Sequence, residues 1–187
     1  DTHLKGMSLE ELMNIEVTSV SKKAESIRKA AAAVYVITQE DIRRSGATGI
    51  PELLRMVPGL QVARIDAHKW AITSRGFPAR FANKLQVLVD GRSVYSPLYS
   101  GVYWDIQEYP LNDIERIEVI RGPGATLWGS NAVNGVINII TKHSKDLQGN
   151  LLSVGVGTEE QGFGEFIHGG KLSDDAFYKV YAKYFNR

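Results

Sequence analysis

The glycine-rich segment RGPGATLWGSN, at residues 121–131, is the first place to look for phosphate chemistry. A Walker loop needs a lysine directly after its second glycine, whereas Gly129 is followed by Ser130. A dinucleotide fingerprint needs G-x-G-x-x-G before a full helix, and Gly122 and Gly124 supply only its first half. Runs of β-branched residues flank the segment. We therefore interpret it as a tight connection between two strands.

Residue types that bind metals are scattered along the chain. There is no cysteine, which excludes disulfides and thiolate sites. No pair of histidines has the spacing of a zinc site, and we predict no metal site and no cofactor. The four histidines are His3, His68, His143 and His168.

Side chains for catalysis also lack the partners that they need. Ser19 and Lys22 match the S-x-x-K pattern, but the S-D-N and K-T-G motifs of that hydrolase class do not follow. Glu118 is the one acid within a strongly apolar run, and Arg116 and Arg121 beside it favour a structural ion pair. We predict no catalytic residue and no enzymatic activity.

Size and composition are those of an ordinary folded domain. The chain has 187 residues, of which 43% are hydrophobic, enough for one domain with a core and an appendage. A net charge of +1 gives no strong field toward nucleic acid. No apolar run approaches the ~18 residues of a membrane-spanning helix, and the N-terminal residues lack the charged head and apolar stretch of a signal peptide.

Short alternating elements fill the region from residue 34 to residue 141. Thr38 is suited to cap a helix that ends before Gly46, and Pro51 fits the first turn of the next helix. We predict that Asn112 caps a turn over 113–115. The predicted helices cover 39–45, 51–56 and 125–128, and the predicted strands cover 34–38, 60–64, 70–75, 85–90, 116–121 and 136–141.

The tail has a different pattern from the region before it. Three segments, 150–157, 163–170 and 177–185, are joined by short polar turns and have the length of strands that cross a membrane in a barrel. In the last one, Tyr178 and Val180 occupy one face, and Lys179 and Lys183 the other. This alternation predicts an antiparallel sheet of hairpins.

The N-terminal residues read as a leader. Residues 8–13 predict a short amphipathic helix, and the β-prone run at 15–21 follows it. No partner strand is evident nearby, so we predict a mobile and unpaired leader.

A long irregular segment, residues 92–109, carries several aromatic side chains. Aromatic side chains on a loop give a large contact area at low entropic cost and often line binding surfaces. The other interpretation is a loop folded over its own core, and the sequence leaves both open. These side chains are Tyr95, Tyr99, Tyr103 and Trp104.

Five motifs in fixed order resemble the plug domain of TonB-dependent outer-membrane receptors. They are VYVITQEDI at 34–42, PELLRMVPG at 51–59, SRGF at 74–77, VLVDG at 87–91 and RIEVIRGPGATLWGSNAVNGVINIITK at 116–142. The tail is similar to the first barrel strands of the same receptors. The resemblance implies an α+β fold, in which a plug with a small mixed sheet and short helices precedes antiparallel hairpins of a truncated barrel.

This resemblance implies a transport function. Such receptors take up scarce solutes, among them ferric siderophores, cobalamin and oligosaccharides, across the outer membrane of Gram-negative bacteria. The plug closes a barrel of about 22 strands, and the inner-membrane protein TonB pulls on a short segment called the TonB box. The run that is similar to this box comprises Ile15, Glu16, Val17, Thr18, Ser19 and Val20.

Two further sets of residues follow from the resemblance. Arg75, Glu118 and Arg121 match polar positions that brace the plug and its contact with the barrel. The loops 77–84 and 93–104 match the outward apices that meet the solute. The residues expected to contact it are Phe81, Tyr95, Tyr99, Tyr103 and Trp104, with Arg80 and Lys84 as partners for an anionic ligand.

We therefore expect three parts: a leader at 1–25, a plug at 26–145 and the first barrel strands at 146–187. The leader would face the periplasm and the barrel strands would lie in the outer membrane. A barrel needs many more strands than this tail contains, so we expect its unpaired edges to join two copies of the chain. The alternative is a stand-alone periplasmic binding or signalling module with a plug-like fold.

Overall fold

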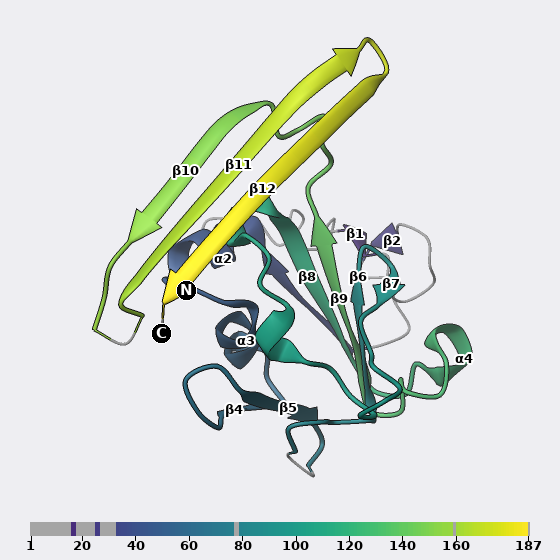
Figure 1. Cartoon of the computed structure of the whole chain (residues 1–187). Helices are drawn as coiled ribbons and strands as arrows, with labels where there is room; N and C mark the ends of the chain where they lie inside the picture. Colours follow the sequence, from purple (N-terminus) through teal and green to yellow (C-terminus); the bar gives the residue numbers. More distant parts are fainter. Residues whose placement is uncertain (1–15, 18–24, 27–32, 77–78, 159, 187) are drawn as a thin grey trace.

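The computed structural model describes residues 16–17, 25–26, 33–76, 79–158 and 160–186. A mixed sheet with short helices forms the core domain, and a second layer of three long antiparallel strands lies beside it (Figure 1). The predicted helix at 8–13 lies outside the described residues. In the part that is described, the predicted α+β class is confirmed.

A five-stranded sheet in the order β3-β8-β9-β6-β7 forms the centre of the core domain. Strands β6 and β9 are parallel, and the other neighbours are antiparallel. The central strands consist largely of isoleucine and valine, which suit a strand covered on both faces. The bounds are β3 Ala33–Thr38, β6 Leu85–Val89, β7 Arg92–Ser93, β8 Ile114–Arg121 and β9 Gly135–Thr141.

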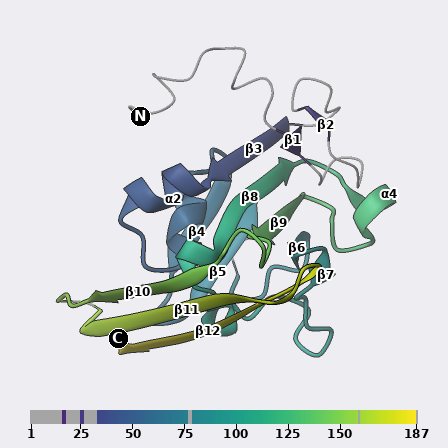
Figure 2. The same cartoon turned by 90° about the horizontal axis from the view of Figure 1, so that it is seen from above.

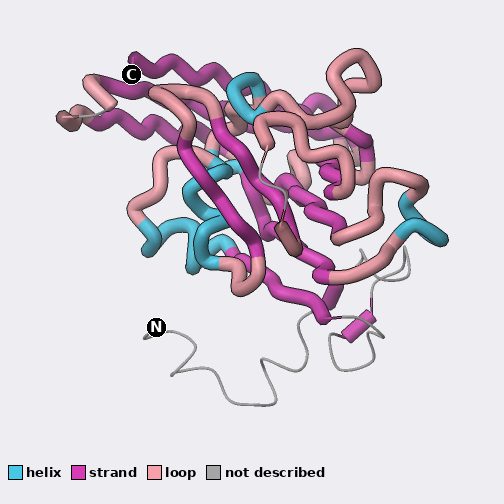
Figure 3. The backbone as a smooth tube through the Cα atoms, turned by 90° about the horizontal axis from the view of Figure 1, so that it is seen from below, coloured by secondary structure: helices cyan, strands magenta, loops and turns pink. Residues whose placement is uncertain are grey.

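Short helices pack against one face of this sheet, and Figure 3 shows how small a part of the chain they form. Helix α2, Gln39–Ser45, begins with a capping box, in which the Thr38 hydroxyl accepts from the Asp41 N–H and the Asp41 carboxylate accepts from the Thr38 N–H. Helix α3, Ile50–Leu53, continues into the 3-10 turn η2, Leu54–Met56. The core between these layers includes Ile42, Leu53, Leu54, Ile117, Ile137 and Ile139.

The glycine-rich segment connects β8 to β9 through the single-turn helix α4, Ala125–Trp128. Gly122 and Gly129 have φ values of 140° and 90°. The N–H of Gly122 donates to the Asn134 carbonyl, and the N–H of Gly124 donates to that of Ala132. The interpretation as a strand connection is confirmed.

The remaining short elements correct one prediction. Strands β4, Leu60–Arg64, and β5, Trp70–Ser74, form a separate hairpin, and the 3-10 turns are η3, Trp104–Ile106, and η4, Leu111–Asp113. The predicted turn over 113–115 is wrong. The turn begins earlier, directly after Pro110, because Ile114 is fully buried and already belongs to β8.

The second layer consists of β10 Gly149–Gly155, β11 Gly162–Ser173 and β12 Ala176–Asn186, here called the wall strands. They pair in sequence order and lie along one side of the core domain (Figure 2). Their inner face carries Glu165, Ile167 and Lys183, which are buried. At Gly169 on the same face, a Cβ would overlap the main chain of Leu147, because the linker from the core domain crosses β11 there.

The leader contributes two short described strands, β1 Glu16–Val17 and β2 Glu25–Ser26. They pair with each other, with Glu16 opposite Ser26 and Val17 opposite Glu25. Val17 is fully buried. The prediction of an unpaired leader is therefore wrong for these residues, because a partner of only two residues gave no strand signal.

Among the described residues, none of the helices is both long enough and apolar enough to cross a membrane.

Candidate functional site

Aromatic rings from two loops meet at one end of the core domain. Phe81 stacks on Tyr99 at a centroid distance of 5.6 Å. Tyr103 meets Phe81 edge-on at 5.1 Å and Tyr99 at 5.0 Å. These separations are favourable for aromatic pairs. We call the three rings, together with Arg80 and Asp105, the apical cluster.

The close approach of the two loops depends on Gly101. A Cβ at this position would lie 2.7 Å from the Cα of Phe81, which is too close for any side chain. Ser96 and Gly101 close the second loop, because the N–H of each donates to the carbonyl of the other at 2.8 and 3.3 Å. The cluster is therefore built by the main chain as well as by the rings.

Charge in the apical cluster is partly balanced. The Arg80 guanidinium lies 5.1 Å from the ring centre of Phe81 and 5.8 Å from that of Tyr103. It also forms an ion pair with Asp105, with 3.6 Å between Nη2 and Oδ2. Burial, followed by the neighbouring Tyr99 hydroxyl, raises the pKa of Tyr103. An anionic ligand would thus compete with Asp105 for Arg80.

The structure brings together four of the predicted apical residues: Arg80, Phe81, Tyr99 and Tyr103. Tyr95 is half-buried, and Lys84 is exposed at the end of its loop. Trp104 is a correction, because its side chain is only 4% exposed and packs in the main core. The interpretation as a loop folded over its own core therefore holds for Trp104, and a binding role of the other aromatic residues stays a prediction.

Sequence reasoning missed two exposed apolar side chains near the apical cluster. Leu98 is 78% exposed in the second loop, and Ile106 is also exposed directly after Asp105. Their residue types fit a core equally well, so the sequence carried no signal for them.

The predicted bracing residues separate into two places. Arg121 donates from Nη1 to the Pro58 carbonyl at 3.1 Å, and its Nε is buried without a partner among the described residues. The Arg75 guanidinium lies close to Gly122, which is the residue that follows Arg121. Glu118 does not join them, because its side chain is on the opposite face of β8 and accepts from Arg116 at 2.8 Å.

A contact that sequence reasoning missed joins β12 to the core domain at Lys179. Its ammonium donates to both carboxylate oxygens of Asp113, at 2.8 and 3.0 Å. It also contacts the Thr141 hydroxyl at 2.9 Å and the Lys142 carbonyl at 2.8 Å. The Asp113 side chain is 1% exposed, and burial raises its pKa while Lys179 acts in the opposite direction.

A second contact of this kind lies further along the same strand. The side chain of Lys183 is 4% exposed and has carboxylate oxygens of Glu108 and Glu165 at 3.1 Å each. Its ammonium donates to the Thr48 carbonyl at 3.2 Å. The alternation along β12 indicated that both lysines share a face, but their partners are distant in sequence and gave no pattern.

A cavity of about 340 Å³ lies beside the Lys183 contact, between α2 and the wall strands. Ile42 and Thr48 line it on the core-domain side, and Phe163 and Glu165 line it on the wall side. The interface between the two layers is therefore not closely packed here.

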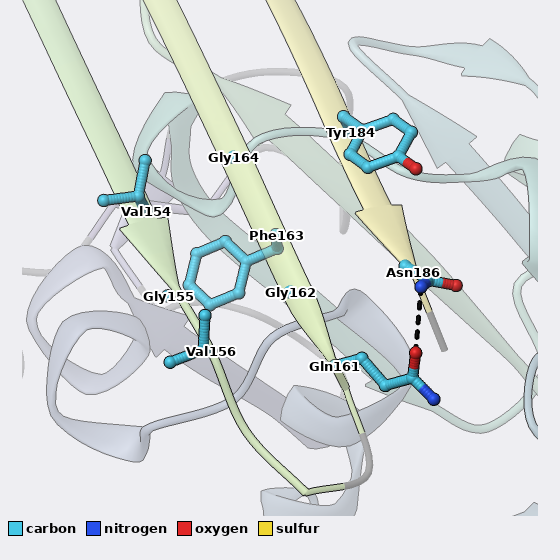
Figure 4. Close-up of a pocket in the computed structure, with 9 residues that line it drawn as sticks. All are labelled: Val154, Gly155, Val156, Gln161, Gly162, Phe163, Gly164, Tyr184 and Asn186. Atoms are coloured by element: carbon cyan, nitrogen blue, oxygen red, sulfur yellow. Dashed lines mark hydrogen bonds between the residues drawn. The ribbon is translucent and has the colours of Figure 1, made fainter.

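The outer face of the wall strands is largely apolar and exposed, with Asn150 and His168 as hydrogen-bonded polar residues on it. Val154, Gly164 and Tyr184 lie side by side on adjacent strands. Because Gly164 has no side chain, a hollow forms between its neighbours, and Figure 4 shows it with Gln161 and Asn186 hydrogen-bonded at one end. Val154 and Tyr184 are largely exposed.

The structure gives little information on the residues similar to a TonB box, and it describes no group of metal-binding side chains. Of the six residues similar to a TonB box, Ile15, Thr18, Ser19 and Val20 lie outside the described residues. Within the part of the chain that the structure describes, no group of three or more histidine or acidic side chains is arranged to hold a metal ion.

Comparison with known proteins assigns the family. The sequence profile described as "TonB-dependent Receptor Plug Domain" matches residues 26–136. The chain belongs to this family of plug domains. The Vitamin B12 transporter BtuB of Vibrio vulnificus (strain CMCP6) is 33% identical over 147 residues, which are 78% of this chain and 23% of that protein.

Solved structures of receptors have the same fold. The pyoverdine outer membrane receptor FpvA from Pseudomonas aeruginosa PAO1 matches with a TM-score of 0.71 at 19% identity, over 91% of this chain and 24% of that one. The ferric enterobactin receptor PfeA matches with a TM-score of 0.60 at 27% identity, over 83% of this chain and 25% of that one. The chain therefore spans about a quarter of the length of these relatives.

Proposed function

We propose that this chain is the plug, with the first barrel strands, of an outer-membrane transporter for a scarce solute. In this proposal residues 1–25 are the leader, 26–145 the plug and 146–187 the start of the barrel. The observation that carries it is the two-sided character of the wall strands. Their outer face is largely apolar, as contact with lipid requires, whereas their inner face directs Lys179 and Lys183 at the plug.

The family supports the rest of the mechanism. TonB would grip the leader from the periplasmic side of a Gram-negative outer membrane and pull. An extended strand such as β1 can add to the edge of a partner's sheet through main-chain hydrogen bonds. Because Glu16 and Val17 already pair with β2, this pairing has to open before TonB can take its place.

Arg75 and Arg121 retain a bracing role in this proposal. Both lie near Gly122, and among the described residues no carboxylate pairs with either of them. Guanidinium groups are suited to hold carboxylates, and we propose that these two hold carboxylates of barrel strands that follow β12. Glu118 instead stabilises β8 through Arg116.

The apical cluster is the proposed contact for the solute. Named relatives transport vitamin B12 or bind ferric enterobactin, and the cluster offers aromatic faces and one arginine. These groups suit a large planar or anionic ligand such as cobalamin or a ferric siderophore, and aromatic faces also suit an oligosaccharide. The relatives described above are transporters and receptors, so we do not retain the stand-alone periplasmic module.

The experiment is a calorimetric titration of the complete receptor that contains this chain. The ligands are cyanocobalamin, a ferric catecholate, a ferric hydroxamate and a maltooligosaccharide. We expect one class to bind, and the double change Phe81→Ala and Tyr99→Ala to raise its Kd at least about tenfold. Tyr184→Ala, on the outer face, is the matched control and should leave Kd unchanged. Binding of no class, or equal effects of the two variants, would contradict the proposal.

We also propose that the isolated chain forms a homodimer through its wall strands. The outer face exposes Leu152, Val154 and Val180, and β10 and β12 each leave one edge without a partner among the described residues. Unpaired edges and apolar faces favour association between copies.

A further inference from the structure

Strand β12 holds the plug by charge at two points. Lys179 and Lys183 both lie on the inner face, because residues at even separations share a face of a strand. Lys179 binds Asp113 in η4, whereas Lys183 binds Glu108 and the Thr48 carbonyl. One strand thus connects parts of the plug that are far apart in sequence.

Separation of β12 from the plug would break buried ion pairs. Asp113 is almost fully buried and would lose Lys179, whereas Lys183 would lose Glu108 and the Thr48 carbonyl and keep Glu165 of the neighbouring strand β11. Removal of one partner from a buried ion pair is strongly unfavourable, because the remaining charge has neither water nor a counterion. Both contacts therefore resist any motion that lifts β12 from the plug.

At the positions of these ion pairs, close apolar packing does not hold the plug and the wall strands together. The cavity beside Lys183 separates α2 from the wall strands, so few side chains interdigitate at this point. At the other contact, Lys179 has four acceptors for three donor hydrogens, which fully satisfies the ammonium.

We propose that Lys179 and Lys183 latch the plug to the first barrel strands, so that this seam stays closed while the solute passes on another side. The inference rests on the proposed transport function. None of the latch partners belongs to the apical cluster, so the latch and the solute contact are separate positions. A plug held in this way pivots on β12 and does not leave the barrel as one body.

The first experiment measures leakage through the complete receptor in cells that lack TonB. The variant with Lys179→Met and Lys183→Met keeps two long unbranched side chains, each one heavy atom shorter than lysine, and removes their charge. We expect cells with this variant to become about tenfold more sensitive to vancomycin, because two buried carboxylates lose their counterions and the seam loosens. Lys171→Met is the matched control, because Lys171 is an exposed wall lysine paired with the exposed Asp174. Equal sensitivity of the two variants would overturn the proposal.

The second experiment fixes the seam covalently. Asp113→Cys and Lys179→Cys, joined by a short bis-maleimide, replace the ion pair with a permanent link in a receptor whose cysteines outside residues 1–187 are changed to serine, since residues 1–187 contain no other cysteine. We expect uptake of the bound solute to continue at the unlinked rate. Loss of uptake with unchanged binding would show that the seam must open and would reject the proposal.

A charge exchange separates latch failure from misfolding. If the methionine variant does not reach the membrane, the receptor with Asp113→Lys and Lys179→Asp should insert and remain as tight as the parent. A leaking exchange variant would reject the latch. If the parent receptor binds no solute, the proposed function fails, while the vancomycin comparison still decides on the latch.

Discussion

The carboxylate of Glu40 in helix α2 forms ion pairs with two arginines. It accepts a hydrogen bond from Arg43 Nη2 at 2.7 Å, and it also pairs with Arg44, the residue after Arg43. The hydrogen bond from Arg43 is the main reason that the pKa of Glu40 falls from 4.5 to about 2. Glu40 lies near the beginning of the helix and the arginines near its end, an arrangement that also suits the helix dipole.

The ionisation of Glu40 predicts a pH-dependent variant. Since its pKa is lower in the folded state, the stabilisation is complete above pH 4.5 and is lost as the pH falls from 4.5 to about 2. We expect Glu40→Gln to lower Tm at pH 7 and to match the parent chain at pH 2, measured by circular dichroism. Asp175→Asn, in an exposed turn, is the control. A Tm difference that is the same at both pH values would contradict the assignment.

At the scale of elements, β8 is the centre of the fold. It pairs with β3 on one side and β9 on the other, and Ile117 in its middle is fully buried. Its side chain packs in the main core together with the helices. The sheet and the helices therefore depend on the same few residues.

Ile117→Ala is expected to destabilise the chain by about 2–5 kcal/mol, because it leaves a cavity in a closely packed core. Leu127→Ala, in the 41% exposed position on α4, should cost less than about 1 kcal/mol. Urea unfolding in mild detergent would give both values from the shift in midpoint. Similar shifts for the two variants would mean that β8 is not the centre of stability.

Elements that the sequence predicted well are those with a strong local pattern. Alternation along β12 separated its two faces, and Thr38 with Gly46 bounded α2. Strand β7 was missed because two residues carry no periodicity. The turn near Asn112 was misplaced because Pro110 and the buried Ile114 shifted it.

The site was predicted in its residue types but not in its contacts. Phe81 and Tyr99 were candidates from their loops, whereas their stacking depends on the close approach of Gly101 to the main chain of Phe81. Lys179 was placed on a face, but its partner Asp113 is 66 residues away. Such contacts arise from the tertiary fold, and single-sequence patterns do not contain them.

For the molecule as a whole, the proposed homodimer depends on the wall strands. We expect the chain to elute from size-exclusion chromatography as a dimer by light scattering, because association of two copies would cover the exposed apolar side chains of the outer face. Deletion of 148–187 should give a monomer, and Leu152→Glu with Val180→Glu should do the same without removal of any strand. A monomer that the deletion does not change would contradict the proposed dimer.

The crossing of the linker over Gly169 has a mechanical consequence. The main chain of Leu147 occupies the space in which any side chain at 169 would stand. This crossing lies on the same strand as Glu165 and next to the strand that bears both lysines. The plug is therefore attached to the wall strands within one small area, both by the covalent linker and by ion pairs. A force applied at the opposite, N-terminal end would rotate the plug about this attachment.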